Sequence, residues 1–577
     1  MQLTNTPLPR ITSISILIAI VVATLMGGGL YKVVVLKVSP PTELTDVAVS
    51  VNSSSKELAR RGKLLDRKNR ILAASRLGYS LFVDPKEVKN PSELSLDLGE
   101  KLSISPATIE EAIRSRPNSR YVVLVPLLTE TQLEIARELS YRGIGLTEHL
   151  VREYPHGEIG ATLIGFVGTE HSGLAGFEDQ FDKALTGESG LFSRQRDSKR
   201  RTLWVSPDQY TPRSDGKDVQ LSIDIVIQKI ATQRLQEEIL RCNAGGGRIV
   251  VADPTTGEIL GMADLLNQRE GWSQQPNDPN REINPRLGRN RCVTDPYEPG
   301  STFKPFVWSA ATELGYANVE EILPTPSSQP YRTPFGRVIR DAHYYGPSSW
   351  EKVLVKSMNS GMAIVSLRLS HEELQDAVQR FGFGEPTRIG LGGETEGIVT
   401  KPNNWNDYTQ TSVSMGHEIA VTPLQMVQGF CAFARDGTIP RLLLTPAKKN
   451  DVIVVGRAIS SNTAEITREI LGRVMTEGTG RRAKSDLYDL FGKSGTAQLP
   501  REDGKGYFED RYISSFIAGA PLDAPKLIVL CVIDDPDRSI DHYGGVVAGP
   551  VVRDVLEESL QYLGVSPTPE YFTDASE

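Results

Sequence analysis

The chain has 577 residues, of which 39% are hydrophobic and 24% are charged, and its formal net charge is −8. A single hydrophobic core rarely grows beyond about 250–300 residues, so this length predicts at least two globular domains. The net negative charge excludes the broad basic surface that nucleic-acid binding requires, so no nucleic-acid partner is expected. The histidines and cysteines lack metal-ligand spacing, and we expect no metal and no cofactor. The four cysteines are predicted to be buried free thiols rather than two disulfides.

The first predicted element is a membrane-spanning helix. No charged residue occurs at positions 11–31, and at about 1.5 Å per residue this stretch is long enough to cross a hydrocarbon core. A cleaved signal peptide is the alternative, because small residues such as Ala23 and Gly27 follow the most apolar part. No A-x-A cleavage site follows and apolar residues continue to Leu36, which favours an uncleaved single-pass anchor in the cytoplasmic membrane. Residues 1–10 would form a short cytoplasmic tail, with the large C-terminal part of the chain on the periplasmic or extracellular side, because long domains cross membranes largely regardless of charge.

Residues 40–205 are predicted to form a separate module that contains strands. Arg61-Gly62 and Asp66-Arg67 make a charged cluster, and residues 79–83 have the composition of a strand. Glycines punctuate the stretch 173–190. No acid, base or nucleophile stands in a motif here, so we expect this module to serve assembly rather than chemistry.

Residues 220–560 are predicted to form an α+β domain, followed by a tail at 561–577. Helical spacing of apolar residues covers 228–240, and 248–262 indicates a strand, a turn and a second strand. Another strand pair is predicted within 512–533. Hairpin-linked strands from both ends of the domain favour a mainly antiparallel sheet flanked by helices.

The strongest chemical signal is Ser301-Thr302-Phe303-Lys304. Residues three apart share one face of a helix, which brings a hydroxyl and an amine within hydrogen-bonding reach. Ser301 is then a candidate nucleophile with Lys304 as its base. Pro299-Gly300 predicts a turn that delivers the serine onto the start of a helix, whose positive end would favour a developing oxyanion.

Two further motifs follow in order: Ser357-Met358-Asn359 and Lys493-Ser494-Gly495-Thr496. Each motif alone occurs by chance on solvated helices. An S-x-x-K, an S-x-N and a K-[ST]-G in this order are the signature of penicillin-binding proteins and class A β-lactamases. The three motifs together therefore predict an acyl-transfer active site.

Over nearly its whole length the chain resembles a class B penicillin-binding protein, a D,D-transpeptidase of bacterial cell-wall synthesis. The resemblance implies the penicillin-binding, serine-transferase fold, preceded by a dimerisation or pedestal domain. Asn69 replaces the glycine usual in the pedestal turn, but asparagine tolerates a left-handed backbone. The motifs that carry the resemblance are Arg61-Gly62-x-x-x-Asp66-Arg67, Gly173-Leu174-x-Gly176-x-Glu178, Asp253-Pro254-x-Thr256-Gly257-Glu258, Glu298-Pro299-Gly300-Ser301, Val421-Thr422-Pro423-Leu424-Gln425 and Tyr543-Gly544-Gly545.

The resemblance also implies five catalytic residues. Ser301 would attack the carbonyl of the penultimate D-Ala of a stem peptide, and Lys304 would take its proton. Ser357 could relay that proton toward the leaving amine, while Asn359 holds Lys304 and the substrate amide. Lys493 would supply positive charge.

Substrate binding is expected to involve Ser494, Gly495 and Thr496. By resemblance, the hydroxyls of Ser494 and Thr496 bind the terminal carboxylate, and Ser494 stands where many relatives carry threonine. The backbone N–H groups of Ser301 and Thr496 would form the oxyanion hole.

Several alternatives stay open at this point. A D,D-carboxypeptidase or a β-lactamase shares the three motifs but uses water as acceptor, and a non-catalytic assembly scaffold is a further possibility. Within class B, Asn359 and the residues after it look more like the cell-division type than the elongation type. The partners that the resemblance implies are stem peptides, β-lactams, a glycan polymerase of the SEDS family and other membrane proteins of the divisome.

Overall fold

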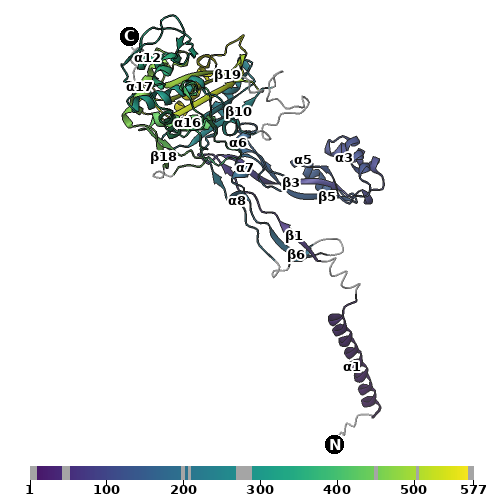
Figure 1. Cartoon of the computed structure of the whole chain (residues 1–577). Coiled ribbons are helices and arrows are strands. Elements are labelled where there is room, and N and C mark those ends of the chain that lie inside the picture. The colour runs from purple at the N-terminus through teal and green to yellow at the C-terminus, as the bar shows by residue number, and fades with distance from the viewer. Residues whose placement is uncertain are drawn as a thin grey trace, which may run out of the picture. The chain divides into compact units, whose positions relative to one another are not determined.

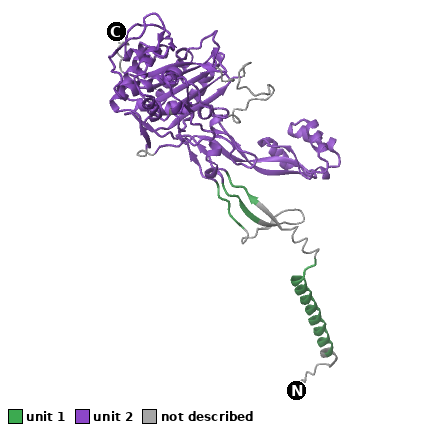
Figure 2. Cartoon of the chain, in the orientation of Figure 1, with its two compact units in different colours: residues 1–60, 187–215 green, residues 61–186, 216–577 purple. Residues whose placement is uncertain are grey.

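The structure is a computed structural model that describes residues 9–41, 52–196, 202–205, 210–267, 289–447, 452–501 and 506–568. The chain forms two compact units (Figure 2). Residues 1–60 and 187–215 make up unit 1, and residues 61–186 and 216–577 make up unit 2. These units group the chain by packing, whereas the predicted domains at 40–205 and 220–560 group it by motif, and those boundaries remain our proposal.

Unit 1 contains a long apolar helix and a small sheet. Helix α1 (Pro9–Val38) is long and apolar enough to span a membrane (Figure 1). It continues beyond the predicted end at residue 31 because neither Lys32 nor Lys37 interrupts helical geometry. Strands β1 (Asn52–Glu57), β6 (Gly190–Arg196) and β7 (Thr202–Val205) pair antiparallel in that order.

In unit 2, the segment that follows Arg61 begins with a mixed sheet that carries three helices. The strand predicted at 79–83 is the end of the longest strand of this sheet, which pairs with three others (Figure 1). The helices bury Leu98, Leu102 and Ile113 against this sheet. The strands are β2 (Leu64–Leu65), β3 (Ile71–Val83), β4 (Val122–Val125), β5 (Ile144–Glu153) and β8 (Val219–Gln220), and the helices are α3 (Pro91–Leu102), α4 (Pro106–Ser115) and α5 (Glu130–Glu138).

The charged motif of this segment forms a buried ion-pair cluster. Glu178, whose side chain is fully buried, accepts hydrogen bonds from Arg61 Nε and Arg152 Nε at 2.7 Å each. Arg61 Nη1 also lies 2.6 Å from Asp182 Oδ1. Asn69 adopts φ 62°, the left-handed conformation that was expected there.

The second half of unit 2 is built on a five-stranded antiparallel sheet with the order β10-β9-β21-β20-β19. Every residue of β9 and β21 is buried, because helices cover both faces. Ile528 and Leu530 of β21 belong to one core cluster with α11 (Lys304–Glu313) and α16 (Pro423–Ala434). Val529 and Cys531 belong to a second with α9 (Ile225–Arg241) and α19 (Gly549–Tyr562). This alternation is that of a central strand. The strands are β9 (Gly246–Ala252), β10 (Ile259–Leu266), β19 (Phe491–Pro500), β20 (Tyr507–Ala520) and β21 (Leu527–Asp534).

Helices make up most of the rest of this half. The longer ones are α9 (Ile225–Arg241), α11 (Lys304–Glu313), α12 (Trp350–Val355), α13 (Asn359–Ser366), α14 (His371–Arg380), α15 (Asp407–Val413), α16 (Pro423–Ala434), α17 (Ser461–Thr476) and α19 (Gly549–Tyr562). The short elements are α6 (Ala161–Ile164), α7 (Gly176–Gln180), α8 (Asp182–Leu185), α10 (Arg291–Thr294), α18 (Gly544–Val547), β11 (Ile322–Leu323), β12 (Tyr331–Arg332), β13 (Val338–Ile339), β14 (Ser348–Ser349), β15 (Ile398–Val399), β16 (Ile419–Ala420), β17 (Thr438–Pro440) and β18 (Val454–Arg457).

The four cysteines are free and buried, as the sequence predicted. Cys242 and Cys531 lie in the core cluster of α9 and α19, and Cys292 and Cys431 lie in the other. Burial raises the pKa of Cys242 and of Cys431 to about 12, which keeps both thiols protonated.

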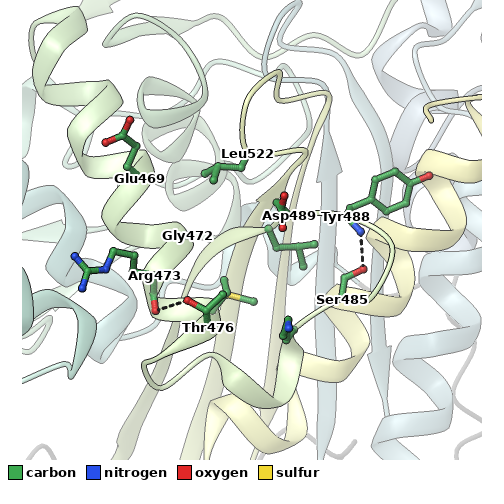
Figure 3. Close-up of a pocket in the computed structure, with 11 residues that line it drawn as sticks. Glu469, Gly472, Arg473, Thr476, Ser485, Tyr488, Asp489 and Leu522 are labelled. Carbon is green, nitrogen blue, oxygen red and sulfur yellow. Dashed lines mark hydrogen bonds between the residues drawn. The ribbon is translucent and has the colours of Figure 1, made fainter. Parts of the chain in front are cut away.

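A cavity of about 210 Å³ lies between α17 and the segment that leads into β19 (Figure 3). Leu490, Tyr488 and Leu522 contribute apolar surface, and Glu469, Arg473 and Asp489 contribute charged groups. None of the residues predicted from the sequence to form the active site lines this cavity.

Candidate active site

Ser301 lies on a tight turn that immediately precedes α11. The turn is a 3₁₀ helix (Gly300–Phe303), and α11 begins only at Lys304, so the serine stands just before the α-helix. In a 3₁₀ helix residues i and i+3 eclipse, which keeps Ser301 and Lys304 on one face. Gly300 adopts φ +54° and donates its N–H to Gly416 O at 3.0 Å. A left-handed glycine at this point sets the direction in which the serine enters the site.

Lys304 is fully buried and its amine contacts the second motif. Its Nζ donates to Ser357 O at 2.7 Å, to Asn359 Oδ1 at 2.6 Å and to Ser357 Oγ at 3.3 Å. Burial lowers the pKa of Lys304 to about 7, and the charge of Asp341 opposes that shift. The amine can therefore lose its proton near neutral pH, which is what a general base requires.

Asn359 is fixed through both ends of its amide. Its Oδ1 accepts from Lys304, and its Nδ2 donates to Arg340 O at 2.8 Å. The amide orientation follows from these two partners, since only the oxygen can face the amine. The first two motifs are thus joined directly through Lys304.

Ser357 adopts a left-handed backbone between α12 and α13, with φ 56°. This conformation costs a residue with a Cβ about 1–2 kcal/mol. It orients both Ser357 O and Ser357 Oγ toward Lys304 Nζ. Strain of this kind concentrates at functional sites.

Two substitutions of Ser357 distinguish the contribution of its hydroxyl to acylation from the effect of its backbone strain on stability. Ser357→Gly and Ser357→Ala both lack the hydroxyl, and each is expected to slow acylation by penicillin about a hundredfold. Glycine relieves the left-handed strain and alanine does not, so Ser357→Gly should be the more stable by about 1 kcal/mol. Urea unfolding of the two variants measures the difference, and equal midpoints would contradict the role of strain.

The third motif lies on β19, one of the two edge strands of the five-stranded sheet. Lys493 is fully buried, and its Nζ contacts Ser494 O at 3.0 Å and Thr479 Oγ1 at 3.4 Å. Burial, together with the charge of Lys304, lowers the pKa of Lys493 well below its ordinary value. The positive charge that was expected at Lys493 is therefore opposed by its surroundings until an anion binds nearby.

Gly495 brings β19 against the turn that carries Ser301. A Cβ at this position would lie 2.6 Å from Pro299 O and 2.9 Å from Thr302 Cγ2, so no other residue fits. Beside it, Ser494 Oγ donates to Thr479 Oγ1 at 2.9 Å, and Thr496 Oγ1 accepts from Gly544 N at 3.0 Å. The strand thus packs at Gly495 against the turn that carries Ser301, while Thr479 and Gly544 fix the hydroxyls of Ser494 and Thr496.

Two residues of this site, Thr479 and Asp341, were not predicted from the sequence. Thr479 contacts both Lys493 and Ser494, and Asp341 accepts hydrogen bonds at the start of α13. The Gly478-Thr479-Gly480 turn after α17 was an available signal for the first, because a polar residue between two glycines indicates a tight, exposed backbone. No motif marked Asp341.

Glu298 anchors the turn of Ser301 from the other side. Its carboxylate lies 3.1 Å from His417 Nδ1 and accepts from Glu418 N at 3.0 Å and from Tyr507 OH at 2.9 Å. Burial and the neighbouring Glu298 charge raise the pKa of Tyr507, so its hydroxyl remains a donor. The sequence had marked Glu298 only as part of a motif.

Comparison with known families decides the identity of the fold. The penicillin-binding protein transpeptidase domain matches residues 247–557, more than half of the chain. The chain belongs to the penicillin-binding proteins. The dimerisation domain of that family matches residues 56–221, the arrangement of class B members.

Relatives of known name extend along most of this penicillin-binding protein. Stage V sporulation protein D of Bacillus subtilis is 32% identical over 531 residues, covering 88% of this chain and 79% of that protein. The probable peptidoglycan D,D-transpeptidase PenA of Neisseria meningitidis is 33% identical, covering 88% and 86%. The peptidoglycan D,D-transpeptidase FtsI of Escherichia coli is 30% identical, covering 88% and 84%.

Solved structures share the fold. A peptidoglycan synthetase from Bifidobacterium adolescentis superimposes with a TM-score of 0.66 at 23% identity, covering 90% of this chain and 98% of that one. Penicillin-binding protein 3 of Mycobacterium tuberculosis, in complex with aztreonam, superimposes with a TM-score of 0.64 at 24% identity, covering 89% of this chain and 98% of that one. The sequence-based predictions of an α+β penicillin-binding fold and of a serine-type transpeptidase are confirmed.

Proposed function

We propose that this penicillin-binding protein is a peptidoglycan D,D-transpeptidase that cross-links stem peptides through a serine acyl-enzyme. The observation that carries the proposal is the environment of Lys304, a buried amine one 3₁₀ turn from Ser301 whose hydrogen bonds go to Ser357 and Asn359. Relatives named as peptidoglycan D,D-transpeptidases support the same reaction.

Acylation begins at Ser301. Its Oγ forms a bond to the carbonyl carbon of the penultimate D-Ala while its proton passes to Lys304 Nζ. The backbone N–H groups of Ser301 and Thr496 receive the oxyanion, an interaction worth about 3–4 kcal/mol per donor in other hydrolases. The carbon–nitrogen bond then breaks, and a proton reaches the leaving D-Ala amine through Ser357 Oγ, which lies 3.3 Å from the lysine amine.

Deacylation runs through the same groups. The amine of a neighbouring stem attacks the ester carbon and gives its proton to Lys304 through Ser357. The bond between that carbon and Ser301 Oγ then breaks as Lys304 returns a proton to the serine oxygen. Water in place of the amine would give carboxypeptidase activity, so the acceptor alone separates the two reactions.

The terminal carboxylate of the donor stem is bound by β19. The hydroxyls of Ser494 and Thr496 donate to it. The Ser494 proton turns from Thr479 Oγ1 to the carboxylate, and Thr479 then donates to Ser494 Oγ. The arriving anion favours the charged form of Lys493, which its buried position otherwise disfavours. Binding of the carboxylate and charging of Lys493 are therefore coupled.

In the cell we propose a role in septal wall synthesis, which the FtsI relative supports. Helix α1 would cross the cytoplasmic membrane once, with the N-terminus inside and the catalytic domain outside. The segment before the transpeptidase domain would contact a SEDS-family glycan polymerase and other divisome proteins. Stem peptides are the substrates, and β-lactams are inhibitors that acylate the same serine.

Labelled penicillin tests the proposal. The full chain should carry one label at Ser301, and Ser301→Ala should carry none. A version that begins at Pro40 lacks α1 and is expected to acylate at the rate of the full chain, since the site lies wholly within unit 2. A label mapped to another residue would overturn the assignment, and rapid turnover of penicillin would favour a β-lactamase.

A further inference from the structure

The loop after β13 contacts the start of α13, where the second motif lies. Asp341 Oδ1 accepts the N–H of Ser360 at 3.0 Å, and its Oδ2 accepts the hydroxyl of Ser360. The backbone carbonyl of the preceding residue, Arg340, accepts a hydrogen bond from Asn359 Nδ2 at 2.8 Å. Two adjacent residues of one loop thus hold two adjacent residues of α13.

Helix α13 lacks a cap of its own. Its N-cap position is Met358, whose side chain makes no capping hydrogen bond. Helix N-termini have unsatisfied N–H groups that a carboxylate can accept, and a negative charge there is favourable. Asp341 supplies that cap from a segment 19 residues away in the chain.

Asp341 also acts on Lys304 through its charge. The groups around the Lys304 amine on α13 and its lead-in, namely Ser357 and Asn359, are uncharged. The basic group from β19 is Lys493, whose own pKa is lowered well below its ordinary value. Asp341 is the carboxylate whose charge favours the protonated form of Lys304, against the effect of burial. The adjacent Arg340 is exposed and faces Asn359 only through its carbonyl.

We infer that Asp341 is a positioning residue of the acyl-transfer site. It caps α13 through Ser360, next to Asn359, and so keeps that amide against Lys304. The inference rests on the proposed role of Lys304 as base. It assigns two separable duties to one carboxylate, a hydrogen-bonding one toward α13 and an electrostatic one toward the lysine.

Three substitutions separate these duties. Asp341→Asn keeps an oxygen for the Ser360 N–H but removes the charge, and Asp341→Ser is a second uncharged cap. Ser360→Ala keeps the charge and removes the hydroxyl contact. Asp407→Asn, which removes an exposed carboxylate on α15, controls for net charge.

The measurement is the second-order rate of acylation by penicillin from pH 5 to 9, on the full chain. The acid limb is the pH range over which the acylation rate rises as Lys304 loses its proton. For Asp341→Asn and Asp341→Ser it should move to lower pH by roughly half to one unit, because a neighbouring negative charge no longer favours the protonated lysine. In Ser360→Ala and Asp407→Asn, the acid limb of the rate profile should lie at the same pH as in the unmodified protein. Asp341→Ala, which also removes the cap, should lower the plateau rate at least tenfold and move the limb in the same direction.

A folded Asp341→Asn or Asp341→Ser protein with an unmoved acid limb would overturn the electrostatic duty, and an unreduced plateau in Asp341→Ala would overturn the cap. A purely structural carboxylate would lower the rate without moving the limb. Failure of the proposed function is distinguishable, because the unmodified protein would then show no label at Ser301 at any pH.

Discussion

Replacing Lys304 with arginine is expected to abolish acylation by penicillin, whereas Lys493→Arg should retain part of it. Both lysines are fully buried, so the steric cost of the larger side chain is similar at the two positions. Arginine keeps the charge but cannot lose its proton, and a base must do so. The difference between the two variants therefore reports chemistry rather than packing.

The unmodified protein should show the same requirement in its pH dependence. The pKa of Lys304 is lowered to about 7, so the amine is mostly protonated below that pH and mostly neutral above it. Because the proposed base is the neutral amine, the acylation rate should rise through about pH 7 and then reach a plateau. Burst kinetics with a labelled penicillin measures this rate at each pH. An equal loss of acylation rate in Lys304→Arg and Lys493→Arg would contradict the proposal that Lys304 is the base and Lys493 supplies charge.

Removing Glu178 should destabilise the protein by about 3–5 kcal/mol. The side chain of Glu178 is fully buried and pairs with Arg61 and Arg152, whose side chains are 2% exposed. Glu178→Ala leaves two buried guanidinium groups without this carboxylate, and an uncompensated buried charge is costly. Limited proteolysis over a urea gradient, which reports opening of this segment, measures the loss.

A matched pair in the same segment provides the control. Arg76 and Glu153 form an ion pair whose side chains are each 48% exposed. Glu153→Ala should cost less than about 1 kcal/mol, because solvent already screens that pair. If Glu178→Ala and Glu153→Ala lowered the free energy of unfolding by similar amounts, burial would not determine how much the ion-pair cluster stabilises the protein.

The sequence predicted those residues of the candidate site that lie close to one another along the chain. Ser301 and Lys304 stand three residues apart, and Ser357 and Asn359 stand two apart, so short motifs describe them. Thr479 and Asp341 reach their partners Ser494 and Ser360 across 15 and 19 residues, through tertiary packing that no spacing rule contains. The left-handed backbone of Ser357 was equally hidden, because no glycine marks it.

The same distinction applies to the fold. Apolar runs and the turn between two of them predicted the antiparallel sheet and its strands at 248–262 and 512–533, since a central strand leaves a strong apolar signal. The ends of α1 and the start of α11 were less predictable. Lysines are compatible with a helix, which let α1 continue past residue 31, and the 3₁₀ turn at Ser301 depends on the contact of Gly300 with Gly416.

The order of strands in the sheet has a consequence for how the enzyme is made. Strand β21 pairs with β9 on one side and β20 on the other, so the middle of the sheet is the strand that is synthesised last. Contacts between β9 and β21 close a loop of more than two hundred residues, the kind of long-range pairing that slows folding. Until residue 534 has emerged, β9 has an open edge where β21 will later pair, and the hydrophobic cores on the two faces of the sheet are incomplete. The nascent chain therefore completes its catalytic domain late, and factors that shield exposed strand edges should matter most for this protein while its last fifth is still being made.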